Sequence, residues 1–181
     1  PEYKSFFFDG QIVPIEDYLE ARPDRRSVIE RLAREGRLRL GPHYILPDEF
    51  LISGESLIRN LLVGTLETAR FAPPERVGYI PDPFGHVSQL PQILNGFGID
   101  SFFFTRGMNA RTWKLGEEFL WKGADGESRV LAIHQWRGYG NAMALGHEMF
   151  DLKFKPFEAK RAIERAERLV AEMLPLTPSG T

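Results

Sequence analysis

Short apolar runs alternate along the chain with longer stretches in which apolar residues recur at helical spacing. Apolar positions three and four apart predict amphipathic helices, whereas short continuous apolar runs predict strands. This pattern predicts strands over residues 5–8, 37–40, 76–80, 101–105, 118–121 and 129–133. It predicts helices after Asp24 and before Gly36, from Ser53 to the Pro73-Pro74 pair, over 90–97 and over 157–173.

Several of these segments carry more specific expectations. The run Phe6-Phe7-Phe8 predicts a buried strand, because an apolar residue faces each side. Asp24 stands where an N-cap belongs, and the Asp125-Gly126 step predicts a hairpin between the last two strands. In the final helix, the apolar positions are expected to face inward; these are Ile163, Ala166, Leu169, Val170 and Met173.

The order of the predicted elements indicates an α/β fold. Strands alternate with helices, and two strands are rich in Phe on both faces, which favours a mostly parallel sheet covered by helices on both sides. In such folds ligands bind at the carboxyl ends of the strands. The polar residues at these ends are Asp9, His43, Tyr44, Asp82, His86, Arg106 and His134. Such a set could hold a divalent metal and bind hydroxyl groups or anions.

These polar residues also have structural interpretations, because strand ends meet water whatever the function. Asp9 precedes Gly10 and is best interpreted as a turn residue, and His43 and His147 are taken as structural histidines. Asp82 lies between two prolines, which restrict the backbone and present its carboxylate stiffly. Two interpretations of Asp82 are equally compatible with this segment. Asp82 is a nucleophile or metal ligand, or the segment simply breaks the chain before the next helix. His86 is expected to cap that helix or to orient a neighbour.

Composition narrows the classes of function. The 181 residues carry a net charge of −2 and are 43% apolar, which is typical of a soluble globular chain and gives no reason to expect nucleic acid or an anionic membrane as partner. No apolar run approaches the roughly 18 residues of a membrane span. Without cysteine, a metal site must use His, Asp and Glu. Gly-rich phosphate loops and a Gly-x-Ser-x-Gly elbow are absent from the sequence.

Two long segments carry a resemblance to a known family. The run from Gly78 to Leu94, which includes Asp82-Pro83-Phe84-Gly85-His86, resembles glycoside hydrolase family 38, the α-mannosidases. So do residues 41–44, 48–50 and 53–62, together with Gly98-Ile99-Asp100 and Arg106-Gly107. The likeness extends from about Phe7 to His134 and is greatest to the bacterial branch.

The resemblance implies a retaining, zinc-dependent α-mannosidase whose catalytic domain is β/α-barrel-like, with mostly parallel strands flanked by helices. Asp82 matches the family's nucleophile, which also binds the single zinc ion. Phe84 would line the sugar subsite and Arg106 would help to place the nucleophile and substrate, whereas Tyr139 matches a substrate-contacting tyrosine only loosely. The implied substrate is a mannose-containing oligosaccharide or a small mannoside. A bacterial cytoplasmic enzyme is expected, and the full-length protein could be a homo-oligomer.

Three parts of the family pattern do not occur in residues 1–181. The upstream His-x-His-Trp-Asp-type metal-binding strand, the downstream acid/base loop and a later zinc-binding histidine are missing, and the chain begins with Pro1. Residues 1–181 are therefore expected to be an incomplete N-terminal catalytic domain that is inactive alone and whose remaining zinc ligands lie elsewhere. Two alternatives are a non-catalytic carbohydrate-binding module of the same fold and a metal-dependent carbohydrate deacetylase.

Overall fold

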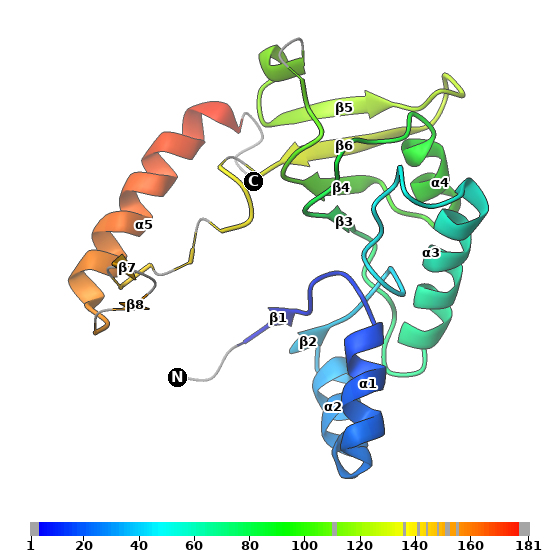
Figure 1. Ribbon diagram of the computed structural model, residues 1–181, viewed down its shortest axis with the longest axis horizontal. Coiled ribbons are helices and arrows are strands. Elements are labelled where there is room, and N and C mark those ends of the chain that lie inside the picture. The colour runs from blue at the N-terminus through cyan, green and yellow to red at the C-terminus, as the bar shows by residue number, and fades with distance from the viewer. Residues whose placement is uncertain are drawn as a thin grey trace.

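The computed structural model describes residues 4–109, 112–135, 137–140, 142–143, 145–147, 149–150, 153–154 and 156–177 (Figure 1). Its helices are α1 (Val13–Ala21), α2 (Arg26–Arg34), α3 (Gly54–Thr68), α4 (Leu90–Gly96) and α5 (Ala159–Met173). Its strands are β1 (Phe6–Phe7), β2 (Leu38–Arg39), β3 (Gly78–Ile80), β4 (Ser101–Phe104), β5 (Glu118–Lys122), β6 (Arg129–His134), β7 (Met149–Phe150) and β8 (Lys153–Phe154). Short 3₁₀ turns lie at Pro23–Arg25, Thr112–Leu115 and Leu174–Leu176.

A central sheet with the strand order β3-β4-β6-β5 positions the site. Strands β3, β4 and β6 run parallel, and β5 joins β6 as the antiparallel hairpin that Asp125-Gly126 predicts. Ile80 lies opposite Phe104, and Phe104 lies opposite His134. The carboxyl ends of the three parallel strands therefore meet at one edge of the sheet.

One face of this sheet packs against α3 and α4 (Figure 1). Phe102 and Phe104 of β4 are buried there against leucines of the two helices, namely Leu57, Leu61, Leu90 and Leu94. On the opposite face Phe103 and Ile133 are only half-buried, and Met173 and Thr177 line a cavity with them at the carboxyl end of α5. Within the described residues, helices thus cover one face of the sheet, and the expectation of two covered faces is wrong there.

A second apolar cluster lies around α1 and α2, beside the parallel pair β1-β2. The sequence pattern does not predict α1, which begins with Pro14 in its first turn and buries Ile15 and Leu19. Phe6 is 52% exposed, so the prediction of a fully buried first strand is wrong; β2 is the only partner of β1 in the described sheets. A strand pair that packs against helices on one side only, as β2 does through Leu38, cannot bury both faces.

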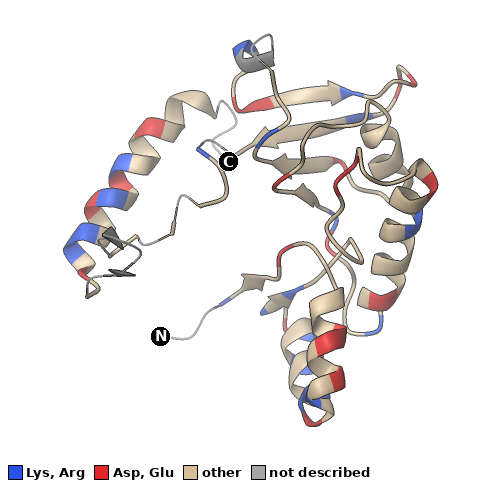
Figure 2. Ribbon diagram, in the orientation of Figure 1, with Lys and Arg blue, Asp and Glu red and all other residues tan. Residues whose placement is uncertain are grey.

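Two helix details also differ from prediction. Asp24 lies in a 3₁₀ turn and pairs with Arg22 and Arg25, so it is not the N-cap of α2. The expected inward face of helix α5 is only partly confirmed, because Ala166, Leu169 and Met173 are half-buried, whereas Ile163 and Val170 are more than half exposed and no residue of the helix is fully buried. The α5 ribbon stands apart from the central sheet, with charged residues of both signs along it (Figure 2).

Helix α3 agrees with prediction at its start, because the Ser53 hydroxyl caps it by accepting a hydrogen bond from the Ser56 amide. Its apolar stripe divides, however. Leu57 and Leu61 are buried, whereas Ile58, Leu62 and Leu66 are exposed. In the part of the chain that the structure describes, no helix has the length and apolar character to cross a membrane.

Candidate functional site

The Asp82 carboxylate lies just after β3, in the stiff segment between Pro81 and Pro83, and Arg106 lies just after β4. Because these strands are parallel neighbours, both side chains emerge at the same sheet edge. The Nε of Arg106 lies 2.6 Å from Oδ1 of Asp82, and the two side chains are 50% and 46% exposed. Ion pairs this exposed contribute little to stability, so the pair serves mainly to orient the carboxylate.

Phe84 is the third member of this group. Its ring is 73% exposed, and the guanidinium carbon of Arg106 lies 5.8 Å from the ring centroid, within cation–π range. Arg106 therefore contacts the acid and the aromatic ring together. An exposed aromatic face beside an oriented carboxylate can stack on the apolar face of a sugar ring.

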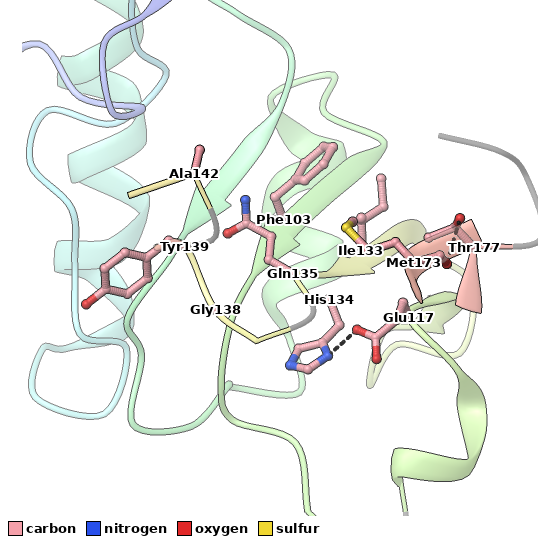
Figure 3. Close-up of a pocket in the computed structure, with 10 residues that line it drawn as sticks. All are labelled: Phe103, Glu117, Ile133, His134, Gln135, Gly138, Tyr139, Ala142, Met173 and Thr177. Atoms are coloured by element: carbon pink, nitrogen blue, oxygen red, sulfur yellow. Dashed lines mark hydrogen bonds and ion pairs between the residues drawn. The ribbon is translucent and has the colours of Figure 1, made fainter. Parts of the chain in front are cut away.

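Tyr139 lies farther along the same edge. It lines a cavity of about 390 Å³ together with Arg106, His134 and Arg137. Its ring points away from the His134–Glu117 pair (Figure 3). Within the described residues no hydrogen bond joins Tyr139 to Asp82 or Arg106, so the structure places it near the group, in a cavity that it shares with Arg106.

His86 orients a neighbour, one of the two roles that the sequence suggests. Its Nδ1 lies 2.7 Å from Oε1 of Glu49, and its Nε2 lies 2.9 Å from the backbone carbonyl of Arg106. The Glu49 side chain is completely buried, and its Oε2 accepts a hydrogen bond from the Val87 amide. Glu49 cannot be recognised as a partner of His86 from the sequence, because the two residues are 37 positions apart and no local pattern distinguishes a buried glutamate from an exposed one.

His134, at the end of β6, makes a parallel arrangement. Its Nδ1 lies 2.5 Å from Oε2 of Glu117 (Figure 3). Its Nε2 lies 2.9 Å from the backbone carbonyl of Thr105. The sequence pattern does not identify Glu117 as a site residue either. The predicted hairpin could have indicated it, because the pairing of β5 with β6 brings the residue before β5 to the end of β6, beside His134.

Asp9 and His43, two further strand-end residues, and His147 lie outside this group. Asp9 occupies a turn with a positive φ of 50° and accepts a hydrogen bond from Gln11, and burial raises the pKa of its carboxyl. His43 is fully buried, and burial lowers its pKa to about 4. His147 packs against Phe157. The structural interpretations of these three residues agree with their positions.

A zinc site would need several such groups together. Among the described residues, no three His, Asp or Glu side chains gather closely enough to hold a metal ion. Asp82 has one ion-paired oxygen, and its second oxygen makes no hydrogen bond within the described part. Within the described residues, Asp82 can therefore offer a carboxylate oxygen at this edge, but no complete set of metal ligands gathers around it.

The comparisons with known proteins bear on this geometry. Residues 1–174 match the family model described as "Glycosyl hydrolases family 38 N-terminal domain". The chain belongs to glycosyl hydrolase family 38. Asp82, Phe84 and Arg106 all lie within residues 1–174, the part of the chain that matches the family 38 model.

Individual family 38 relatives agree. A Halalkalibacterium halodurans protein named "Putative mannosylglycerate hydrolase" is 36% identical over 153 residues, which are 78% of this chain and 17% of that protein. Human "Alpha-mannosidase 2C1" is 32% identical over 138 residues, covering 72% of this chain and 13% of that protein. The crystal structure of an α-mannosidase from Enterococcus faecalis superposes with a TM-score of 0.84 at 32% identity, over 99% of this chain and 19% of that one. The chain therefore spans less than a fifth of the length of these relatives.

Proposed function

We propose that the full-length protein is a retaining, zinc-dependent α-mannosidase that hydrolyses terminal α-mannosides, with Asp82 as its nucleophile. The observation that carries this proposal is the Asp82 carboxylate, held by Arg106 at a parallel sheet edge beside the exposed Phe84 ring, in a family 38 chain. The family's α-mannosidase members, such as the human relative, support the same activity.

The proposed reaction uses the oriented carboxylate directly. A retaining glycosidase has two carboxyl groups about 5–5.5 Å apart, one acting as nucleophile and the other as acid and then base. An Asp82 oxygen attacks the anomeric carbon while the glycosidic C–O bond breaks and the acid protonates the leaving oxygen. Water, deprotonated by the same residue, then releases mannose and restores the carboxylate. Arg106 fixes Oδ1 and leaves the second oxygen to face the sugar.

Asp82 would also be one ligand of the zinc ion, with the remaining ligands supplied by other parts of the longer protein. Bound zinc supplies Lewis acidity and a template for sugar hydroxyls. The second carboxyl group would likewise come from outside residues 1–181, which we propose are part of a β/α-barrel-like catalytic domain. We also propose a cytoplasmic location, with which the absence of cysteine is compatible.

The proposed substrate is a mannose-containing oligosaccharide or a small mannoside. Phe84 would stack on the sugar, Arg106 would contact it beside the nucleophile, and Tyr139 would reach it from the neighbouring cavity. The name of one relative refers to mannosylglycerate, a small mannoside, whereas the name of the human relative, an α-mannosidase, specifies no particular mannoside.

The test is Asp82→Asn in the full-length gene product, assayed with an aryl α-mannoside. Loss of the nucleophile should lower kcat by about a thousandfold or more with the fold retained. Asp17→Asn, which removes an exposed carboxylate on α1, is the matched control and should keep wild-type turnover. Full activity of Asp82→Asn would refute the nucleophile assignment.

The same preparation separates the alternative functions. NMR of the first product should detect the α-anomer, as retention requires. Mannoside binding by the wild-type protein without turnover would instead support the carbohydrate-binding module. Release of acetate from an acetylated sugar without glycosidic cleavage would support the deacetylase.

A further inference from the structure

Two histidines bind consecutive backbone carbonyls of the segment that carries Arg106. His134, at the end of β6, lies with Nε2 2.9 Å from the Thr105 carbonyl. His86, in the loop after β3, lies with Nε2 2.9 Å from the Arg106 carbonyl. Since β4 lies between β3 and β6, the Thr105–Arg106 backbone is held from both sides.

Each histidine is itself fixed by a glutamate. Glu49 binds Nδ1 of His86 at 2.7 Å, and Glu117 binds Nδ1 of His134 at 2.5 Å. Both ring nitrogens of each histidine thus face an oxygen, one from a carboxylate and one from a carbonyl. Hydrogen bonds that involve an ionised group are roughly twice as strong as neutral ones, and a ring flip would disrupt both bonds of that ring.

The brace at His86 is also fixed by packing. The His86 ring meets the Phe102, Phe104 and Trp121 rings edge-on at centroid distances of 5.4, 4.9 and 5.6 Å. Gly107 has a φ of +97°, and a Cβ on it would lie 2.6 Å from the His86 ring. The turn after Arg106 is therefore shaped around this histidine.

The Arg106 side chain is half exposed, and within the described residues it contacts the Asp82 carboxylate and the Phe84 ring. Its direction therefore depends on the backbone from which it projects. A shift of about 1 Å at a catalytic group can cost about a hundredfold in rate.

We propose that the Glu49–His86 and Glu117–His134 pairs are two braces that fix the Thr105–Arg106 backbone and so direct the Arg106 guanidinium onto Asp82. The four residues are positioning residues that act through Arg106. The kinetic consequence rests on the α-mannosidase function proposed above, whereas the geometric consequence does not.

A double-mutant cycle in the full-length gene product tests the kinetic consequence. His86→Ala and Glu117→Ala should each lower kcat at least about tenfold. In an Arg106→Ala background the same changes should cause little further loss, because residues that act through Arg106 are non-additive with it. His147→Ala, a histidine outside the braces, is the control and should leave kcat unchanged. Equal losses with and without Arg106 would overturn the proposal.

Conservative variants separate positioning from general stability. In Glu117→Gln the amide NH2 can donate to Nδ1 of a neutral His134, whose Nε2–H can then still donate to the Thr105 carbonyl. Turnover should therefore stay near wild type, while Glu117→Ala loses it. Glu117 is 14% exposed, so this brace can be tested even if variants of the buried Glu49–His86 brace do not fold. An equal loss of kcat in Glu117→Gln and Glu117→Ala would contradict hydrogen-bonded positioning.

Crystal structures of Glu117→Ala and wild type give a readout that does not depend on activity. The Arg106–Asp82 separation, 2.6 Å in the intact site, should lengthen or break in the variant. An unchanged pair in the variant would overturn the braces whatever the enzyme does. A broken pair in a protein without mannosidase turnover would support the braces and refute only the proposed function.

Discussion

Arg106 contacts an acid, an aromatic ring and, through its carbonyl, a buried histidine. Its guanidinium is half exposed, yet its backbone is bound to a brace anchored in the core. This combination allows a side chain to reach solvent and substrate while keeping a defined direction. Mutations at the braces would therefore affect the site without touching the substrate.

The burial of His43 makes the protonated form of its side chain unfavourable in the folded state. The side chain is fully buried, and neither ring nitrogen has a hydrogen-bond partner in the described part of the chain. Burial, offset in lesser part by the Gly10 backbone, lowers its pKa from 6.5 to about 4. The folded state therefore disfavours protonation that the unfolded chain allows.

Because of His43, we expect the free energy of unfolding to decrease as the pH is lowered. The lowered pKa of His43 means that its contribution to stability is fully present above pH 6.5 and is lost as the pH falls towards 4. At pH 5 the loss should be about 2 kcal/mol relative to pH 7. Urea unfolding of the wild type and of His43→Gln at both pH values measures this loss. The difference between the two proteins separates the contribution of His43 from the pH dependence that the carboxylates cause. The same pH dependence in both would contradict this prediction.

Helix α3 packs unusually close to the segment 41–44. A Cβ added at Gly64 would lie 2.2 Å from the His43 carbonyl carbon and 2.2 Å from the Tyr44 amide nitrogen. The Asn60 side chain, one turn earlier, accepts hydrogen bonds from the amides of Tyr44 and Ile45. A glycine inside a helix normally weakens it, but here it permits this backbone contact.

Gly64→Ala should therefore destabilise the protein by about 3 kcal/mol, although glycine to alanine usually stabilises a helix interior. The backbone atoms of residues 42–44 cannot yield as a flexible side chain would. Gly96→Ala in α4 is the control, because its added Cβ meets no atom within 4 Å. It should change the free energy of unfolding by less than about 1 kcal/mol. Urea unfolding followed by circular dichroism distinguishes them, and similar stabilities would show that α3 moves away freely.

The whole molecule exposes apolar side chains on helices that lack a covering layer. Ile58, Leu62 and Leu66 form an exposed face on α3, and Ile163 and Val170 are exposed on α5. Soluble monomers seldom leave large contiguous apolar patches uncovered. Since the chain spans less than a fifth of its relatives' length, these faces fit a domain to which further chain contributes.

We therefore expect a polypeptide of residues 1–181 alone to bind the dye ANS more strongly than the full-length protein, and to lack mannosidase turnover. A Leu62→Gln/Leu66→Gln double variant should reduce dye fluorescence, whereas Arg59→Gln, an exposed polar change on the same helix, should not. Measurable turnover by residues 1–181 would contradict the expectation that a second carboxyl group and zinc ligands lie elsewhere.

Much of the local structure was predictable because its causes are local. Ser53 caps α3, Asp125-Gly126 forms a hairpin, and Gly98 ends α4 with positive φ. Helix α1 escaped prediction because Pro14 interrupts its start, and its buried pair, Ile15 and Leu19, gains its partners only when α2 and Phe71 pack on it. The inward face of α5 was predicted only in part, because periodicity identifies an apolar face but not whether a partner covers it.

The sequence by itself determined the α/β alternation, the family and the strand ends at which Asp82 and Arg106 stand. These properties follow from residue type, spacing and chain order, which need no knowledge of distant contacts. Only the tertiary structure decided that Glu49 lies 2.7 Å from His86 and that Glu117 lies against His134. The reason is physical: the pairing of β5 with β6 brings together Glu117 and His134, which are 17 positions apart, whereas packing of the turn before α3 against the loop after β3 brings together Glu49 and His86, which are 37 positions apart. Both contacts are tertiary, and local residue patterns do not contain them.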